Sequence, residues 1–176
     1  MSYYAIMAVG LTVVIITGGI DISVGSIMAL SALAGAAALQ GFPDNAPAWQ
    51  VLPVAFAIPM LVGLLCGLIN GTFVVGLNLH PFIVTLGTMS IFRGLANVLP
   101  SQKTLPAAGR RLPEAFTTHF MRADLFGIQP MPLIIMLVCV ALGWFYLHLM
   151  VAGRETYAVG GNEEAARFSG LRVNRI

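Results

Sequence analysis

The chain has 176 residues, of which 58% are hydrophobic and only 9% are charged. Soluble domains carry about 25% charged residues, so this composition excludes an ordinary water-soluble globule. The formal net charge of +2 and the lack of a basic run also argue against a nucleic-acid-binding protein. Residues 45–92 and 125–153 contain no Asp, Glu, Lys or Arg, and each gap is long enough for a membrane-spanning helix. We therefore expect an all-α, polytopic membrane protein with about five transmembrane helices.

The first two predicted spans cover residues 4–18 and 24–39. A glycine pair ends the first span, and Asp21 and Ser23 stand directly before the second, where either can cap the new helix. The alternative role for Asp21 and Ser23 is that of residues of a gate or of a translocation path. The second span is rich in small residues spaced four apart, a pattern typical of closely packed membrane helices.

The third predicted span covers residues 51–75 and repeats glycine every four residues at Gly63, Gly67 and Gly71. This series indicates that the helix packs closely against a neighbour. Asn70 lies on the adjoining face and needs a hydrogen-bond partner within the apolar surroundings.

The fourth predicted span, residues 82–99, carries Thr85, Met89, Arg93 and Asn97 at intervals of four, which predicts one polar stripe. An arginine within a span costs a few kcal/mol unless it is paired or reaches the interface. Two interpretations stay open. The stripe faces a translocation pathway, or Arg93 extends its side chain to the lipid headgroups.

Residues 101–130 are polar and predict an extramembrane loop with a short helix at about 113–122, and a fifth span follows at 131–150. Four basic residues lie in this loop and four lie after the fifth span. The excess of basic residues that normally marks the cytoplasmic side is therefore missing, and charge does not decide the orientation.

A short amphipathic segment follows the fifth span. Glycines at its start permit a turn, Asn162 is a competent N-cap, and Gly170 suits a left-handed residue that ends a helix. The pattern is consistent with a solvated connector or with a stiff lever for a soluble partner. The residues that define the segment are Gly160, Gly161, Asn162, Glu163, Ala165, Ala166, Arg167, Phe168, Ser169 and Gly170.

Several other classes of function find little support. Cys66 and Cys139 lie in apolar runs and are expected to pack rather than to bind metal, and the histidines share no ligand-like spacing. No phosphate-binding Walker A pattern occurs, so we expect no cofactor in this chain. An intramembrane protease would need a serine–histidine or paired-aspartate constellation within the spans, which is not visible. A secondary transporter could use the helix break between Gly18 and Gly25.

Four stretches together resemble a known family. In chain order they are residues 5–10, residues 18–26, residues 81–88 with Arg93-Gly94, and residues 157–171. The chain resembles the membrane permease subunit of bacterial ABC importers for monosaccharides, of the ribose, xylose and galactose type. The resemblance implies a fragment of a ten-helix permease in the bacterial inner membrane. It also implies three partners: a cytoplasmic ABC ATPase that binds the ATP, a periplasmic sugar-binding protein, and a second permease subunit in a homo- or heterodimer.

The same resemblance implies an orientation. Residues 1–153 form the transmembrane region, the Asp21 turn is cytoplasmic, and the loop 101–130 is periplasmic. Residues 154–176 are then a cytoplasmic coupling segment, in which Glu163 and Arg167 make polar contacts with the ATPase while Ala165 and Phe168 pack into its surface.

The resemblance leaves the substrate open. Permeases for autoinducer-2, nucleosides and branched-chain amino acids share the architecture and are the alternatives to a monosaccharide. Members of the family are considerably longer than 176 residues. We therefore expect a chain truncated at both ends, which does not transport by itself.

Overall fold

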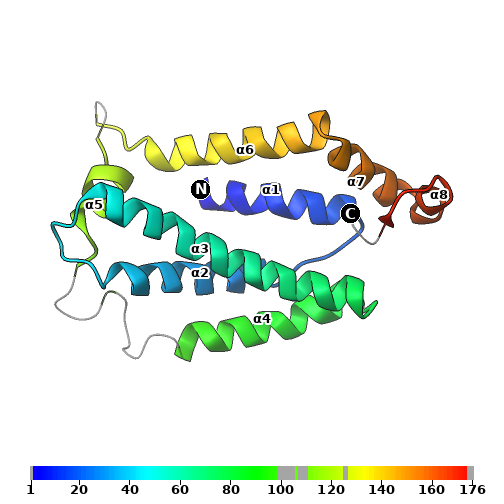
Figure 1. Ribbon diagram of the computed structural model, residues 1–176, viewed down its shortest axis with the longest axis horizontal. Coiled ribbons are helices and arrows are strands. Elements are labelled where there is room, and N and C mark those ends of the chain that lie inside the picture. The colour runs from blue at the N-terminus through cyan, green and yellow to red at the C-terminus, as the bar shows by residue number, and fades with distance from the viewer. Residues whose placement is uncertain (1, 99–105, 107–110, 125–126, 174–176) are drawn as a thin grey trace. The chain divides into compact units, whose positions relative to one another are not determined.

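The computed structural model describes residues 2–98, 106, 111–124 and 127–173, most of which are helical (Figure 1). The helices are α1 (Ser2–Ile16), α2 (Val24–Leu39), α3 (Ala48–Gly71), α4 (Pro81–Val98), α5 (Glu114–Phe116), α6 (Met131–Leu149), α7 (Val151–Gly161) and α8 (Glu163–Phe168), with π-helical turns η1 (Thr72–Gly76) and η2 (Thr117–Met121). The chain divides into two compact units, one made of Met1–Asp21 with Pro132–Ile176 and the other of Ile22–Met131. We call them unit 1 and unit 2.

In unit 2, α2 and α3 pack as an antiparallel pair through small residues. A Cβ at Gly35 of α2 would lie 2.7 Å from Cγ of Pro59 of α3, and a Cβ at Gly63 of α3 would lie 3.6 Å from Oγ of Ser31. The partners run in opposite directions along the two helices, four residues apart on each. The small-residue pattern of α2 therefore serves the close packing that the sequence predicts.

The glycine series of α3 is only partly used. Gly63 faces α2, whereas Gly67 and Gly71 are exposed and an added Cβ there would meet no described atom within 4 Å. A helix turns by about 100° per residue, so a strict four-residue spacing drifts around its axis. Cys66 and Asn70 take the inward positions at this end of α3 instead. Within unit 2, Gly63 thus packs against α2, whereas the role predicted for Gly67 and Gly71 in packing against a neighbour stays a prediction.

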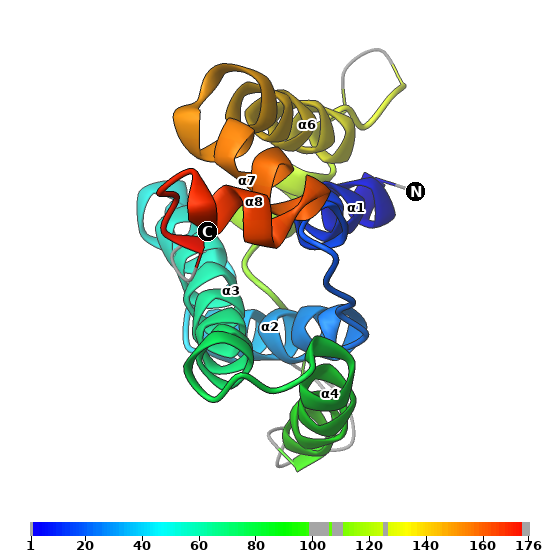
Figure 2. The same cartoon turned by 90° about the vertical axis from the view of Figure 1, so that its right-hand side faces the viewer.

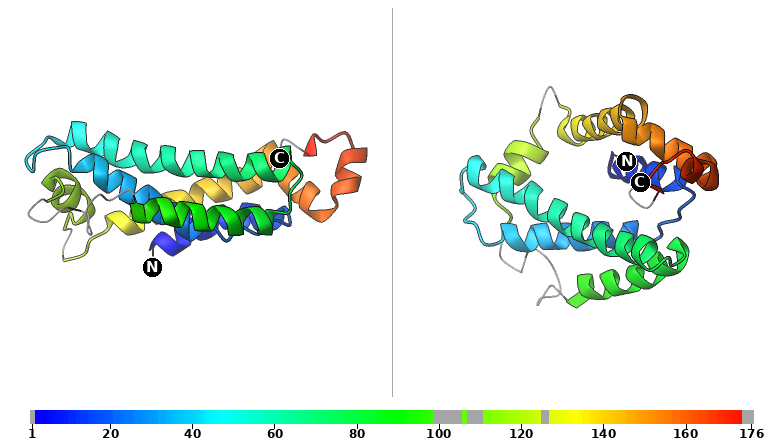
Figure 3. Two further views of the ribbon diagram at one scale, coloured as in Figure 1. Left: turned by 90° about the horizontal axis from the view of Figure 1, so that it is seen from below. Right: turned by 45° about the vertical axis from the view of Figure 1, so that its right-hand side comes forward.

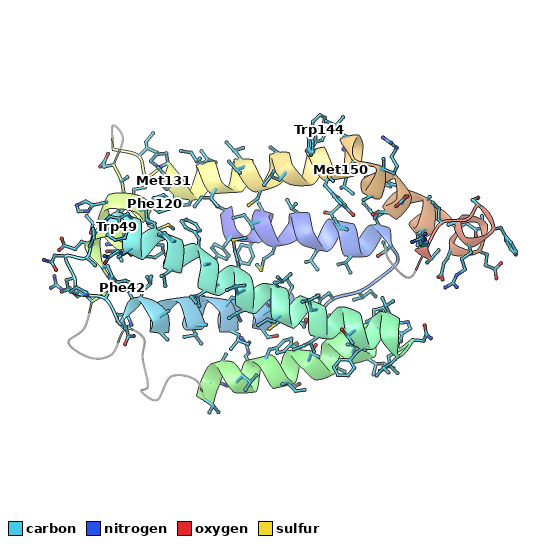
Figure 4. All side chains as sticks on the ribbon, in the orientation of Figure 1. Phe42, Trp49, Phe120, Met131, Trp144 and Met150 are labelled. Atoms are coloured by element: carbon cyan, nitrogen blue, oxygen red, sulfur yellow. The ribbon has the colours of Figure 1, made fainter. Side chains whose placement is uncertain are left out.

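The third helix of unit 2, α4, turns one apolar face inward. Phe92 and Ala96 of α4 form a buried cluster with Leu30 of α2 and Cys66 of α3. A second cluster at the opposite end of α2 joins Leu39, Ala46, Val51, Ala55 and Ala115. Phe42, Trp49 and Phe120 gather at that end (Figure 4), where the rings of Phe56 and Phe120 meet edge to face with centroids 5.5 Å apart. The predicted short helix at 113–122 is confirmed by α5 and η2.

Unit 1 contains α1, α6, α7 and α8 (Figure 2). The α6 helix ends at Leu149, Met150 is extended with ψ of 149°, and α7 begins at Val151. The α7 helix includes Gly160 and Gly161, so the turn predicted at these glycines is wrong. The chain leaves the helix at Asn162, whose φ of −161° and ψ of 104° are extended.

Among the described residues, three helical segments are long and apolar enough to cross a membrane: Ala48–Gly76, Pro81–Val98 and Met131–Leu149. They correspond to the third, fourth and fifth predicted spans. The α1 and α2 helices lie where the first two spans are predicted, with 15 and 16 residues. Both are shorter than the roughly 20 residues of a typical spanning helix.

Candidate functional site

An open pocket of about 620 Å³ lies between the first turns of α2 and the second half of α4, within unit 2. Its lining combines one cation, one amide, two hydroxyls and several apolar groups. The lining residues are Ile22, Gly25, Ser26, Met28, Met89, Ser90, Arg93, Gly94 and Asn97.

The predicted polar stripe of α4 contributes three of its four members. Met89, Arg93 and Asn97 line the pocket, whereas Thr85 is buried and does not. Residues four apart on a helix are offset by about 40°, so three such steps turn the stripe by about 120°. This winding carries Thr85 into the interior of unit 2, while Asn97 stays at the pocket.

Arg93 is the charged group of the pocket, and its side chain is exposed. None of the described lining residues is acidic. A cation on a spanning helix is tolerated where it faces a water-filled cavity or a protein partner rather than lipid. The pocket gives Arg93 an open space within unit 2 that is lined in part by polar groups.

The α2 side of the pocket is held by buried hydrogen bonds. Ser26 donates its hydroxyl to the carbonyl oxygen of Ser23 at 2.7 Å, and Asn70 of α3 donates from Nδ2 to Oγ of Ser23 at 2.9 Å. The hydrogen-bond partner predicted for Asn70 is thus found in Ser23. Ser23 occupies the N-cap position of α2, but its side chain makes no capping hydrogen bond, which corrects that part of the prediction. Asp21 is half-buried and belongs to unit 1.

Sequence reasoning missed the whole α2 side of the pocket lining, namely Ile22, which precedes α2, and Gly25, Ser26 and Met28 of α2. Only the three-dimensional pairing of α2 with α4 brings these residues opposite Arg93. Ser90 and Gly94 could have been found, because each follows a stripe residue by one position on the same helix. No cluster that could hold a metal ion occurs within the described ranges.

A second candidate site is the short helix α8 in unit 1. Asn162 caps α8, its Oδ1 accepting a hydrogen bond from the backbone N–H of Ala165 at 2.9 Å. Arg167 pairs with Glu163 one turn earlier, with Nη2 and Nε lying 2.8 and 3.2 Å from the same carboxylate oxygen. Gly170 has φ of 84° and ends the segment. The cap and the glycine stop are confirmed as predicted.

The two faces of α8 differ. Phe168 is 90% exposed and Ala165 is exposed on the same side, whereas Ala166 is 4% exposed and packs inward. Ala166 therefore packs α8 against its own unit and lies on a different face from Phe168. In Figure 3, α8 lies beyond the end of α7. Phe168 is the most exposed of the large hydrophobic side chains among the described residues.

Apolar spanning helices, a polar pocket on one of them and an amphipathic helix beyond the last define the class of polytopic helical membrane proteins. The family model described as "Branched-chain amino acid transport system / permease component" matches residues 1–176, and the chain belongs to this family. The resemblance to importer permeases is confirmed at the level of the family.

Curated relatives agree with this assignment. The chain is 38% identical over 175 residues to the "Autoinducer 2 import system permease protein LsrD" of Escherichia coli O9:H4 (strain HS). It shows the same identity to the proteins of that name from Escherichia coli (strain K12) and Shigella flexneri. Each alignment covers 97% of this chain and 49% of the relative, so the chain spans about half the length of the curated relatives it matches. No solved structure matches it.

Proposed function

We propose that the chain is part of the permease subunit of an ATP-driven importer in the bacterial inner membrane. ATP binding and hydrolysis belong to a separate cytoplasmic subunit, a periplasmic binding protein delivers the substrate, and a second permease subunit completes the channel. The observation that carries this proposal is α8, a capped and charged helix with exposed Phe168, placed after a spanning helix in a chain of the permease family.

The coupling role of α8 is tested by ATP-driven uptake in the complete permease with its partners. Phe168→Asp puts a charge where an apolar contact is proposed and is expected to abolish uptake and ATPase co-purification. The matched control is Tyr157→Asp, since Tyr157 is an aromatic residue of α7 that is also exposed, at 47%. Normal uptake by the Phe168→Asp variant would refute the assignment of α8.

The charged pair of α8 gives a second test. Arg167→Glu places two carboxylates one turn apart, which destabilises a helix by only a few tenths of a kcal/mol. The exchange variant Glu163→Arg with Arg167→Glu restores the pair within α8 but inverts the surface shown to a partner. We expect uptake to be lost in both variants, because both residues contact the ATPase. Recovery of uptake in the exchange variant would mean that the pair only stabilises the helix.

We further propose that Met89, Arg93 and Asn97 face the translocation pathway. The test introduces single cysteines along α4 in a background in which Cys66 and Cys139 are replaced by alanine. Positions 89, 93 and 97 should react with a membrane-impermeant thiol reagent, whereas the exposed positions Ile91 and Leu95, which do not line the pocket, should not. Equal reactivity at all five positions would remove the pathway assignment.

Asp21 stays a candidate gate residue at the cytoplasmic mouth. Asp21→Asn removes its charge while retaining its size and capping capacity. If Asp21 only caps a turn, the Asp21→Asn variant transports normally. A gate role requires that substrate leak through the membrane without ATP, or that ATP-driven uptake stop.

For the substrate, a monosaccharide is the first candidate and autoinducer 2 the second. The three relatives at 38% identity are named for autoinducer 2 import, which favours autoinducer 2 over nucleosides, while the family description names branched-chain amino acids. Uptake of labelled ribose, autoinducer 2 and leucine, each with its own binding protein present, separates these candidates. If leucine is the only one of the three that is transported, the proposals of a monosaccharide and of autoinducer 2 as the substrate are both refuted.

A further inference from the structure

The α6 and α7 helices are joined by a tight bend at Met150. A Cβ at Gly153 would overlap the carbonyl oxygen of Tyr146 and lie 2.7 Å from Cα of Leu147. The hydroxyls of Tyr146 and Thr156 lie 3.3 Å apart, and Thr156 is only 1% exposed. The backbone contact at Gly153 and the partly buried hydrogen bond between Tyr146 and Thr156 fix α7 against the end of α6.

Both α6 and α7 contact α1, within unit 1. A Cβ at Gly160 of α7 would overlap the carbonyl oxygen of Ile16 and lie 2.8 Å from its carbonyl carbon. A Cβ at Gly143 of α6 would overlap Cγ1 of Val9. Val9 and Ile16 are seven residues apart, so they lie on one face of α1 two turns from each other. The α6 helix therefore contacts α1 at the side chain of Val9, and α7 contacts the backbone of Ile16, the last residue of α1.

The α8 helix is joined firmly to this assembly. It begins two residues after Gly161, with Asn162 as its cap and Ala166 buried beneath it. A displacement of α8 at Phe168 would therefore move the end of α7. Through the backbone contact at Gly160 it would also move Ile16, the last residue of α1. From Ile16 the chain continues through residues 17–23 to α2, which lines the pocket at Gly25 and Ser26.

We propose that Gly160 is a positioning residue, and that its contact with the carbonyl of Ile16 transmits movement of α8 to α1. This inference rests on the proposed coupling function of α8. Tight contact requires glycine here, because the opposing atoms are backbone atoms that cannot rotate away from a side chain.

The neighbouring glycine supplies the matched control. Gly161 lies in the same helix, and a Cβ there would meet no described atom within 4 Å. Alanine favours helix more than glycine does, so propensity predicts that both Gly160→Ala and Gly161→Ala strengthen α7. Only the contact with Ile16 predicts that Gly160→Ala loses more function than Gly161→Ala.

The experiment measures ATPase co-purification, ATP hydrolysis and substrate uptake for the complete importer in proteoliposomes. We expect Gly160→Ala and Gly160→Leu to retain the ATPase and its hydrolysis, while uptake per ATP falls about tenfold, a typical size for a coupling between sites. Gly161→Ala, whose Cβ would meet no described atom, should keep uptake per ATP well above that of Gly160→Ala.

If the Gly160→Leu variant takes up as much substrate per ATP as the unmodified protein, the inference is overturned. Loss of the bound ATPase in Gly160→Ala would also overturn it, because Gly160 would then be needed for assembly and not for transmission. The Phe168→Asp variant separates this inference from the proposed function. If Phe168→Asp keeps the ATPase and its uptake, the coupling role of α8 fails, whatever the Gly160 variants show.

Discussion

The hydrogen bond between Ser23 and Asn70 allows a sharp prediction about the stability of unit 2. Ser23 is fully buried and Asn70 is 7% exposed, and Nδ2 of Asn70 lies 2.9 Å from Oγ of Ser23. Oδ1 of Asn70 is also buried and makes no hydrogen bond to the described residues. Asn70 therefore depends on Ser23 for a partner, since its other polar atom is already unsatisfied.

The size of the effect follows from this asymmetry. Ser23→Ala strands the whole buried amide of Asn70 and should lower the free energy of unfolding by about 1–3 kcal/mol. Asn70→Leu removes the amide and preserves most of the volume, so it should cost less, about 1 kcal/mol. The double variant leaves neither group unpaired and should be less destabilised than Ser23→Ala alone. The coupling between the two positions should be about 0.6–1.7 kcal/mol, the range for hydrogen bonds between membrane helices.

The assay is unfolding of the purified protein by a denaturing detergent in mixed micelles, followed by circular dichroism. Ser31→Ala is the matched control, because Oγ of Ser31 is buried but has no hydrogen-bond partner among the described residues. Its removal should be neutral or stabilising. The reasoning is refuted if Ser23→Ala behaves like Ser31→Ala, or if the effects of Ser23→Ala and Asn70→Leu simply add.

Two further predictions concern unit 1. Gly143→Ala should lower the free energy of unfolding by about 1–3 kcal/mol through overlap with Val9, and Val9→Ala should restore most of it, as measured by the same detergent titration. Asn162→Ala removes the cap of α8, at a cost of about 1 kcal/mol, and should weaken ATPase binding about fivefold in a pull-down titration, whereas Asn162→Asp should not.

For each of these two predictions, one result would contradict it. If Val9→Ala does not rescue Gly143→Ala, then α1 and α6 do not meet at this point. Equal ATPase binding by the Asn162→Ala and Asn162→Asp variants would show that the order of α8 does not matter for the interaction.

The sequence predicts the helices well because their signals are local. Hydrophobic runs and their charged or glycine ends place α2 and α6 within a residue of their observed limits. The α8 helix is also predicted, because a cap at Asn162 and a left-handed glycine at Gly170 depend only on near neighbours.

Two features could not be read from the sequence, because they depend on contacts between helices distant in the chain. The α2 wall of the pocket becomes visible only when α2 is placed against α4. Gly160 suggests a turn because it stands next to Gly161. In the structure it instead makes a close contact with Ile16, which lies 144 residues earlier in the chain. Sequence spacing alone does not distinguish a glycine at a turn from one at a contact.

The central claim is that α8 is the surface through which the permease engages its ATPase. The most direct measurement places a photo-cross-linking amino acid at position 168 of the complete permease, in membranes that contain all its partners, and at position 157 as the matched control. We expect the probe at 168 to form a covalent adduct with the cytoplasmic ATPase, with a yield that changes on ATP binding, and the probe at 157 to form none. Adducts at 168 with lipid alone, or equal yields at both positions, would contradict it.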